Sequence, residues 1–558
     1  MNIEMIKRLI PGLIGAATLS LWSGRAATVA WVGSSGDWNA PSNWSTGALP
    51  TSADDVVVDV PGEVTITHST GAHTVKSMLC QEMFDLAGGE LEVIGTVQVN
   101  NTMRLSGGKL IGATIVRPLN GAQLLASGGT LQGVTLESDL IVGNGKQLQV
   151  ANGLTFVGGA KVVLKASGVG AYLNFFQGEQ VVGGEGEIVL EGEDPIQRIQ
   201  IGKLDGLTGL RIGPNVRIRG QGAINGSGSL INEGTIQADV RDRVLSIVVA
   251  EGGFTNAGTL RAMGGGTLNA TQLERNSTSV GSVMVFDDSV LRLNGSIIVH
   301  SNRTLRSQQS GTVNLGGNVL GDTHEAGLFT PRGTTIFDGL GGNDSPQKLE
   351  AMSLDIGTNI SAFAGAFAFG SIRLANNTHL RIVDFSDNSP GTESEAVYAN
   401  TISVPLNTTL DLNGLHLYAR IAFLEGIVTN GLVLQIPDSG PISRSVYTGG
   451  VVSIPGELDE WTFFGRVGET ITVSVETGGE KLDAPHLSYA NVRLLAPSSL
   501  VLAQSSNIVS GQTVELRDVT LPADGLYRIH VNAPAGREAS AGNYRVSCWE
   551  VTPDVSPL

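Results

Sequence analysis

One pattern recurs through the middle of the chain at an interval that few folds share. Residues 87–91, 106–110 and 127–131 read AGGEL, SGGKL and SGGTL, at intervals of 19 and then 21 residues. A second pair, NEGTIQA at 232–238 and NAGTLRA at 256–262, is 24 residues apart. This period is the length of one coil of a solenoid, in which each coil buries its inward face only by stacking on its neighbours.

The segments between the glycines indicate strands. They are short, rich in β-branched residues, and in places alternate apolar with polar side chains, as in 91–93 and 97–99. Gly-Thr and Asn-Gly pairs are typical of corners, where a positive φ is often required. We therefore predict a parallel β-helix over residues 61–435, with a globular β-sandwich as the alternative. About 350 residues at about 21 per coil give roughly 17 coils and a rod on the order of 80 Å.

The first 26 residues have the pattern of a signal peptide. Lys7 and Arg8 precede an apolar stretch at 9–22, and small residues end the segment at Ala26. The alternative is a buried N-terminal helix. We expect the rest of the chain to be secreted or held at the cell surface, without an integral membrane segment. The tail at 553–558 contains no apolar span and no sorting motif, so we expect no covalent or membrane anchor.

Three tryptophans mark the entrance to the repeats, at 27–60. Trp31, Trp38 and Trp44 lie in a segment that resembles the opening of large secreted bacterial β-helix proteins of the adhesin or haemagglutinin-like kind. Clustered tryptophans can stack on sugar rings, but the open end of a solenoid must also be shielded. We expect these three side chains to cap the solenoid.

The pattern changes after a linker at 436–446. Short alternating strands over 447–552 predict a small antiparallel β-sandwich. This segment resembles the bacterial pre-peptidase C-terminal domain, through GELDEWTF at 456–463, GETITV at 468–473, LLAP at 494–497, LPADGLY at 521–527 and AGNY at 541–544. It departs from that family at Ser499, where a glycine is usual. Since members of the family can bind calcium, the resemblance implies Asp459, Asp483 and Asp524 as candidate ligands. The alternative is that they are solvated turn carboxylates.

The composition of the chain limits the kinds of partner and covalent bond that can be expected. The net charge is −17, so nucleic acid is excluded as an expected partner, because binding it depends on Lys and Arg. The chain has two cysteines, Cys80 and Cys548. An elongated fold would separate them, so we expect two buried, unpaired thiols.

No motif assigns a catalytic residue. The eight histidines are scattered, and metal, nucleophile-elbow and phosphate-loop spacings are absent from the sequence. Asp287 and Asp288 form the best adjacent carboxylate pair, but neighbouring strand residues point to opposite faces. A loop that contains four acidic residues could hold calcium or be solvated, and we favour solvation (Asp384, Asp387, Glu393 and Glu395).

These observations favour a non-catalytic function. We expect an exported, adhesin-like binding or structural protein, without a cofactor other than calcium. Its expected partner is an extracellular polysaccharide or a cell-surface component. The alternatives are a polysaccharide lyase or hydrolase on the same scaffold, and a fragment of a larger secreted enzyme.

Overall fold

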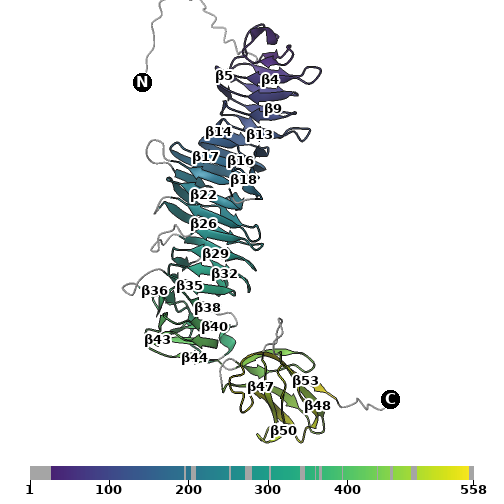
Figure 1. Cartoon of the computed structure of the whole chain (residues 1–558), viewed down its shortest axis with the longest axis vertical. Helices are drawn as coiled ribbons and strands as arrows, with labels where there is room; N and C mark the ends of the chain where they lie inside the picture. Colours follow the sequence, from purple (N-terminus) through teal and green to yellow (C-terminus); the bar gives the residue numbers. More distant parts are fainter. Residues whose placement is uncertain are drawn as a thin grey trace, which may run out of the picture.

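The computed structural model describes residues 27–551 apart from short internal gaps at 194–195, 203–208, 250–252, 271–279, 301–302, 340–345, 359, 364–366, 392–393, 437, 453–455 and 479–486. The predicted signal peptide and the tail at 553–558 therefore lie outside the described residues. The described chain is almost entirely β, with 57% in strands and 2% in helix, and about 17 turns form a parallel β-solenoid. The predicted fold class is confirmed (Figure 1).

Each coil visits three faces in the same order, and strands of one face pair in parallel with those of the next coil, apart from one short strand at 353–354, which pairs antiparallel. The first face contains β1 (Thr28–Ala30), β3 (Asp55–Val58), β6 (Ser77–Cys80), β9 (Thr96–Val99), β12 (Thr114–Ile115), β20 (Gly209–Ile212), β23 (Ser229–Asn232), β30 (Ile297–Val299), β33 (Val319–Gly321), β36 (Gln347–Glu350), β39 (His379–Val383), β41 (Thr409–Asp411) and β43 (Ile427–Thr429).

The second face carries the candidate site. It contains β2 (Gly36–Asp37), β4 (Thr65–His68), β7 (Met83–Leu86), β10 (Met103–Leu105), β13 (Leu124–Ala126), β15 (Leu140–Val142), β21 (Val216–Gly220), β24 (Thr235–Ala238), β31 (Leu305–Ser307), β34 (Phe329–Pro331), β37 (Ser353–Leu354) and β44 (Val433–Gln435). The third face contains β5 (Ala72–Val75), β8 (Glu90–Val93), β11 (Lys109–Ile111), β17 (Tyr172–Phe175), β19 (Arg198–Ile201), β22 (Gly222–Gly226), β25 (Val244–Val248), β27 (Thr267–Ala270), β29 (Val290–Leu293), β32 (Thr312–Leu315) and β35 (Thr334–Phe337).

Some strands bend around a corner and belong to two or three faces. They are β14 (Thr130–Leu136), β16 (Gln147–Ala166), β18 (Glu179–Gly192), β26 (Phe254–Ala262), β28 (Val280–Val285), β38 (Phe369–Leu374), β40 (Glu395–Val404) and β42 (His416–Leu424). Three short 3-10 helices occur between strands, at η1 (Pro41–Asn43), η2 (Ala326–Leu328) and η3 (Ile360–Phe363).

The repeat seen in the sequence is the register of the coils. Leu110 pairs with Leu91 above it and with Leu131 below it, and all three side chains are buried. Likewise Asn232 pairs with Asn256, whose side-chain oxygen accepts a 2.6 Å hydrogen bond from the Asn232 amide. Equivalent residues therefore stack at the strand spacing of roughly 4.8 Å. The stacked apolar residues form one continuous core inside the solenoid.

The glycine corners have two different causes. The Asn152-Gly153 corner does use positive φ, at 55° and 83°. The Gly-Thr corners at Gly234 and Gly258 have no positive φ. There a side chain is excluded by the next coil, because a Cβ added to Gly258 would lie 2.1 Å from the carbonyl oxygen of Gly234. The expectation of positive φ was thus wrong at these two Gly-Thr corners, although it holds at Gly129-Thr130, where the φ of Gly129 is 77°.

The three tryptophans at the entrance are buried. Trp31, Trp38 and Trp44 are at most 2% exposed, and Trp44 packs edge-on against the other two, with ring centroids 5.0 Å and 4.7 Å away. Trp38 also packs edge-on against Phe84 of β7, with ring centroids 6.0 Å apart. Side chains buried in this way close the end of the solenoid core and leave no ring face for a sugar.

The C-terminal part has its own core between two sheets. The five-stranded sheet is ordered β45 (Ser439–Pro441), β47 (Leu458–Gly465), β52 (Gly525–Asn532), β49 (Asn491–Leu495) and β50 (Val501–Ser506). The four-stranded sheet is ordered β46 (Thr448–Val452), β53 (Gly542–Glu550), β48 (Thr470–Glu476) and β51 (Val514–Thr520). Pairing is antiparallel apart from β45, which runs parallel to β47.

Cys80 and Cys548 are both buried and unpaired, as expected. Burial raises the pKa of each thiol to about 12, so neither is a reactive thiolate near neutral pH. Among the described residues, no helix is long and apolar enough to cross a membrane.

Candidate functional site

The coils become irregular in the last third of the solenoid, at one corner. Connections between successive strands are short in most coils. Longer stretches separate β33 from β34 (322–328), β36 from β38 (351–368, which contains β37 and η3) and β39 from β40 (384–394). Insertions on a single face of a repeat protein map to loops that often form its binding face. The two cavities described next lie beside these insertions.

The first cavity has a volume of about 560 Å³ and lies on the second face. It forms where the ladder of that face is interrupted, since among the described residues β34 pairs with β31 alone. Strand β38 follows the insertion 351–368 and reaches this face only at its first residue, Phe369. The lining comes from four successive coils and two insertions (Gln309, Ala326, Gly327, Phe329, Thr330, Arg332, Phe363, Ala368, Phe369, Gly370 and Asn400).

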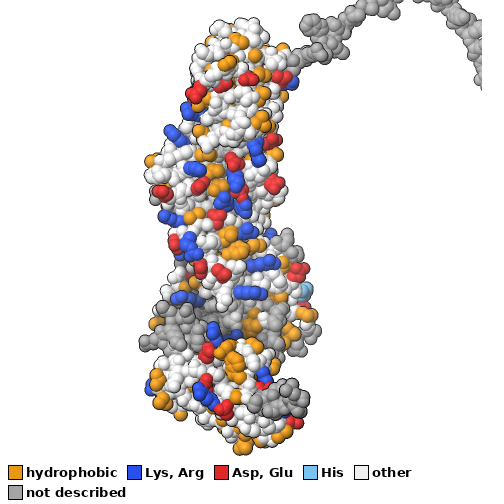
Figure 2. Space-filling model, turned by 90° about the vertical axis from the view of Figure 1, so that its right-hand side faces the viewer, with side chains coloured by type: hydrophobic (Ala, Val, Ile, Leu, Met, Phe, Trp, Pro, Cys, Tyr) orange, Lys and Arg blue, Asp and Glu red, His pale blue; other side chains and the backbone are white. Residues whose placement is uncertain are grey.

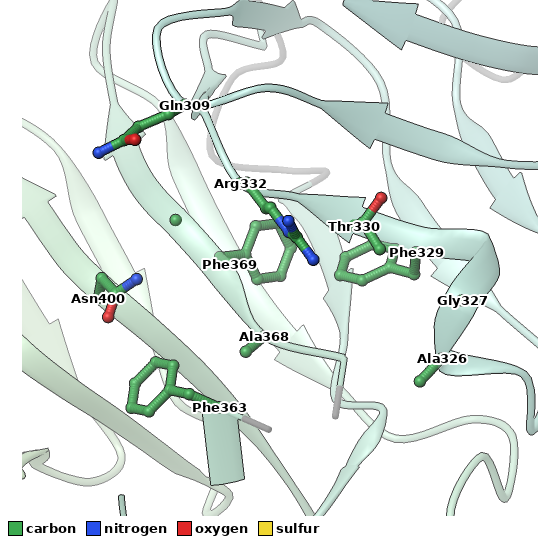
Figure 3. Close-up of a pocket in the computed structure, with 11 residues that line it drawn as sticks. Gln309, Ala326, Gly327, Phe329, Thr330, Arg332, Phe363, Ala368, Phe369 and Asn400 are labelled. Carbon is green, nitrogen blue, oxygen red and sulfur yellow. The ribbon is translucent and has the colours of Figure 1, made fainter. Parts of the chain in front are cut away.

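Aromatic rings form the floor of this cavity. Phe329 and Phe369 are at most 2% exposed and meet edge-on at 5.0 Å. Phe363, from η3, is half-buried and lies at the edge of the opening in Figure 3. Gly370 allows the closest backbone approach, because an added Cβ would lie 1.8 Å from the carbonyl oxygen of Arg332. The floor is therefore rigid and apolar, with one accessible ring.

Polar side chains surround the opening. Gln309, Arg332 and Asn400 are exposed and approach it from different coils (Figure 3). The Arg332 side chain has no hydrogen bond or ion pair with any described residue, so its guanidinium donors are available. The lining residues include no carboxylate and no histidine. The polar side chains can thus hydrogen-bond a ligand while the aromatic floor makes apolar contacts with it. The described lining residues contain no acid–base pair.

The second cavity, of about 390 Å³, contains titratable groups. It is lined by Asp355, Ser394, Glu395, Gly414, Leu415 and His416. Asp355 accepts hydrogen bonds from His416 Nδ1 at 2.5 Å and from the Tyr418 hydroxyl at 2.8 Å. Burial alone would raise the pKa of Asp355, but these two hydrogen bonds hold it below its usual value. The Tyr418 ring in turn stacks on the Tyr398 ring, with ring centroids 4.9 Å apart.

Two buried glutamates hold the insertion 384–394 in place. One oxygen of Glu350 accepts the backbone N–H groups of Phe385 and Ser386, and one oxygen of Glu395 accepts those of Asn388 and Ser389. The second oxygen of each is buried and has no hydrogen-bond partner among the described residues. Burial, together with the charge of Asp384, raises the pKa of both carboxyls to about 7.

The acidic loop is therefore not uniformly solvated. Asp384 and Asp387 are exposed, as expected, but Glu395 is 3% exposed and fastens the loop to the solenoid. Glu393 lies outside the described residues. Within the described chain, no group of three or more His, Cys, Asp or Glu residues is arranged to hold a metal ion.

The structure places two of the three proposed calcium ligands, Asp459 and Asp524, and keeps them apart. Asp459 is fully buried in the sandwich, where its carboxylate accepts a 2.6 Å hydrogen bond from the Tyr544 hydroxyl and burial raises its pKa to about 8. Asp524 is exposed beside Gly525, at the opposite end of the β47–β52 pair, where it accepts the N–H of Val467. Asp483 lies outside the described residues.

The adjacent pair in the repeats occupies a corner. Asp288 has a φ of 58°, and Asp287 accepts hydrogen bonds from the backbone and hydroxyl of Ser310 in the next coil. Both carboxylates are exposed. Asp287 thus stabilises a turn between two coils.

Sequence reasoning missed the first cavity because its residues share no motif. Gln309, Arg332, Phe363 and Asn400 come from successive coils, and the lengths of the insertions decide which of them meet. The sequence did contain one indication of the insertions, because the period of the repeat lengthens beyond residue 321. After β33, which begins at 319, the next first-face strands begin at 347, 379 and 409.

Comparison with known proteins adds little. No family model and no curated protein matches the sequence. Several solved structures show weak similarity, including three with TM-scores of 0.15 or 0.16. PliG of Aeromonas hydrophila, a periplasmic inhibitor of g-type lysozyme, is 17% identical over 20% of this chain and 96% of its own, with a TM-score of 0.15. The pre-peptidase C-terminal domain of a collagenase from Bacillus anthracis is 17% identical over 20% of this chain and 95% of its own, with a TM-score of 0.15.

The third structure is the enzymatically active domain of tailspike protein 4 of bacteriophage CBA120. It is 12% identical over 89% of this chain and 64% of its own, with a TM-score of 0.16. None of the three assigns a function to this chain.

Proposed function

We propose that this protein is an exported, adhesin-like glycan-binding protein without catalytic activity. The observation that carries the proposal is the first cavity: a rigid aromatic floor, amide and guanidinium donors around the opening, and no carboxylate in the lining. A sugar-binding site requires polar groups that fix the orientation of the sugar and apolar side chains that contact its ring. Hydrolysis of a glycoside would require a pair of carboxyl groups flanking the bond.

A glycan array probed with the full mature chain tests this proposal. We expect binding to at least one extracellular polysaccharide, and loss of that binding in the double variant Arg332→Gln/Asn400→Ala. The matched control is Arg104→Gln, an exposed arginine on the second face far from the cavity. Binding that survives in the double variant, or no binding to any glycan, would contradict the proposal.

Export and retention are part of the same proposal. Export is supported by the signal-like pattern at 1–26, and we propose that the C-terminal sandwich docks the protein at the surface, with calcium as a candidate cofactor. Fractionation of cells before and after a high-salt wash and a chelator wash tests this. Protein that resists both washes and remains with detergent-extracted membrane would contradict it.

A polysaccharide hydrolase is the second candidate, and one observation favours it. The second cavity places the Asp355–His416 pair beside Glu395, whose pKa of about 7 suits an acid catalyst. However, the Glu395 carboxyl is buried and already binds two backbone N–H groups. Release of reducing ends from a bound glycan, abolished by Glu395→Gln in a variant that keeps the wild-type melting temperature, would favour the enzyme.

A further inference from the structure

Outward side chains stack into a column along the second face. Successive strands β21, β24, β26, β28, β31 and β34 place one such residue each in register (Arg219, Gln237, Arg261, Met284, Arg306 and Thr330). An arginine therefore recurs at every second coil, at intervals of roughly 10 Å, which is two strand spacings. Arg332 follows Thr330 at the lower end and lines the first cavity.

At the upper end of this column, the positive charges are neutralised. Arg219 forms ion pairs with Glu187 at 3.1 Å and with Asp239 at 3.5 Å. Lys161 and Arg217 share the same Glu187, so that one carboxylate is surrounded by three cations. Burial alone would raise the pKa of Glu187, but hydrogen bonds from the two arginines hold it below its usual value.

The three lower arginines have no carboxylate partner among the described residues. Arg261 is half-buried and donates only to the Gln237 side-chain oxygen at 3.3 Å and to the Met284 sulfur at 3.8 Å. Arg306 donates to the carbonyl oxygen of Gly327, at 3.0 Å. The strands of this face from β24 to β34 contain no acidic residue. Burial lowers the pKa of Arg261, and the charge of Arg217 lowers it further.

This arrangement is unusual for an acidic protein. The chain has a net charge of −17, and Figure 2 shows acidic and basic side chains interspersed on the face that it draws. Arg261 is half-buried without an anion, which has an unfavourable desolvation cost. Arg306 and Arg332 are exposed and also lack an anion among the described residues, so a ligand that supplies negative charge would satisfy all three guanidinium groups. Guanidinium groups fit carboxylate and sulfate groups through paired hydrogen bonds.

We propose that an acidic polysaccharide, carrying carboxylate or sulfate groups, binds along the second face from Arg261 to the cavity at Arg332. The proposal rests on the glycan-binding function above and specifies its ligand class. The polysaccharide would lie along the solenoid axis, with its negative groups meeting Arg261, Arg306 and Arg332 and with neutral parts in the cavity. Single-stranded nucleic acid fits less well, because it needs exposed aromatic platforms and Phe329 and Phe369 are at most 2% exposed.

Titration calorimetry with four defined polymers tests the proposal: polygalacturonate, a sulfated glycosaminoglycan, neutral dextran and oligo-dT. We expect at least one acidic polysaccharide to bind more tightly than dextran and oligo-dT, with affinity that falls as salt is added. Each of Arg261→Gln, Arg306→Gln and Arg332→Gln should weaken binding about fivefold, the size of one exposed charge pair. The triple variant should lose binding at physiological salt.

The matched control is Arg211→Gln, which removes an equal charge from the first face, where Arg211 is paired with Glu233. Binding equal to wild type in this variant and an unchanged melting temperature in all variants show that the loss is local. Equal affinity for dextran and the acidic polymers would overturn the acidic ligand class but leave glycan binding intact. Absence of binding to every polysaccharide would remove the proposed function as well. Tighter binding of oligo-dT would assign the column to nucleic acid instead.

Discussion

At the scale of single residues, two buried glutamates contribute to the pH dependence of stability. Glu350 and Glu395 bind four backbone N–H groups of one insertion, and their pKa values of about 7 lie well above the ordinary value of 4.5 because they are buried. Between these values the folded chain binds more protons than the unfolded chain. Stability must therefore fall as the pH rises from about 4.5 through 7. Sequence reasoning found Glu395 but placed it in a solvated loop, because burial of a loop carboxyl depends on the neighbouring coils.

We expect the melting temperature to rise as the pH is lowered from 8 to 6.5. Each glutamate should contribute on the order of 1 kcal/mol over this window, since one pKa unit corresponds to about 1.4 kcal/mol and the window extends only about half a unit below the pKa of about 7. Glu350→Gln and Glu395→Gln should be more stable than wild type at pH 8 and should flatten the pH profile. Asp384→Asn is the control for the neighbouring charge and should have a smaller effect. A wild-type melting temperature that rises with pH over this window would contradict the assignment.

At the scale of elements, stacked backbones decide where glycine is required. A Cβ at Gly258 would lie 2.1 Å from the Gly234 carbonyl oxygen, and a Cβ at Gly281 would lie 2.1 Å from that of Gly258. The sequence was sufficient to predict the coils, because NEGTIQA and NAGTLRA are stacked in register. It was not sufficient to predict the cavity, because Arg332 and Asn400 meet only through the folded lengths of the insertions at 322–328 and 351–368.

Substitution of Gly258 by alanine should push two coils apart. We expect a loss of about 1–3 kcal/mol in the free energy of unfolding, the usual cost of overpacking, measured by denaturant unfolding followed by circular dichroism. Gly327→Ala is the control, because an added Cβ there contacts nothing within 4 Å. Equal stability of the two variants would show that close backbone approach is not what requires glycine at this corner.

At the scale of the whole molecule, about 17 coils and a small two-sheet body make an elongated particle (Figure 1). The recurrence of the glycine strings was enough to predict this shape, since each coil adds a fixed rise. The charge of the whole chain did not predict the arginine column. Net charge sums over all faces, whereas the register of β26 and β31 places Arg261 and Arg306 on one face, and Arg332 directly follows β34 of the same face.

Small-angle scattering of the mature chain should show this elongation. A compact chain of this length would have a radius of gyration of about 24 Å, and a solenoid of roughly 80 Å extended by the C-terminal sheets must exceed that value clearly. The pair-distance distribution should have the long tail of a rod. A symmetric distribution with a radius of gyration near the compact value would contradict the elongated architecture in solution.

The central claim is that a polysaccharide binds at the irregular end of the second face and leaves uncut. Hydrogen–deuterium exchange of the full mature chain, with and without the tightest-binding polysaccharide of the calorimetry, locates the contact directly. We expect slower exchange in peptides covering 305–332, 360–370 and 395–404, no change in the tryptophan cap at 27–60, and no new reducing ends in the same sample. Protection confined to the C-terminal sheets or to the cap, or release of oligosaccharides during the incubation, would contradict the claim.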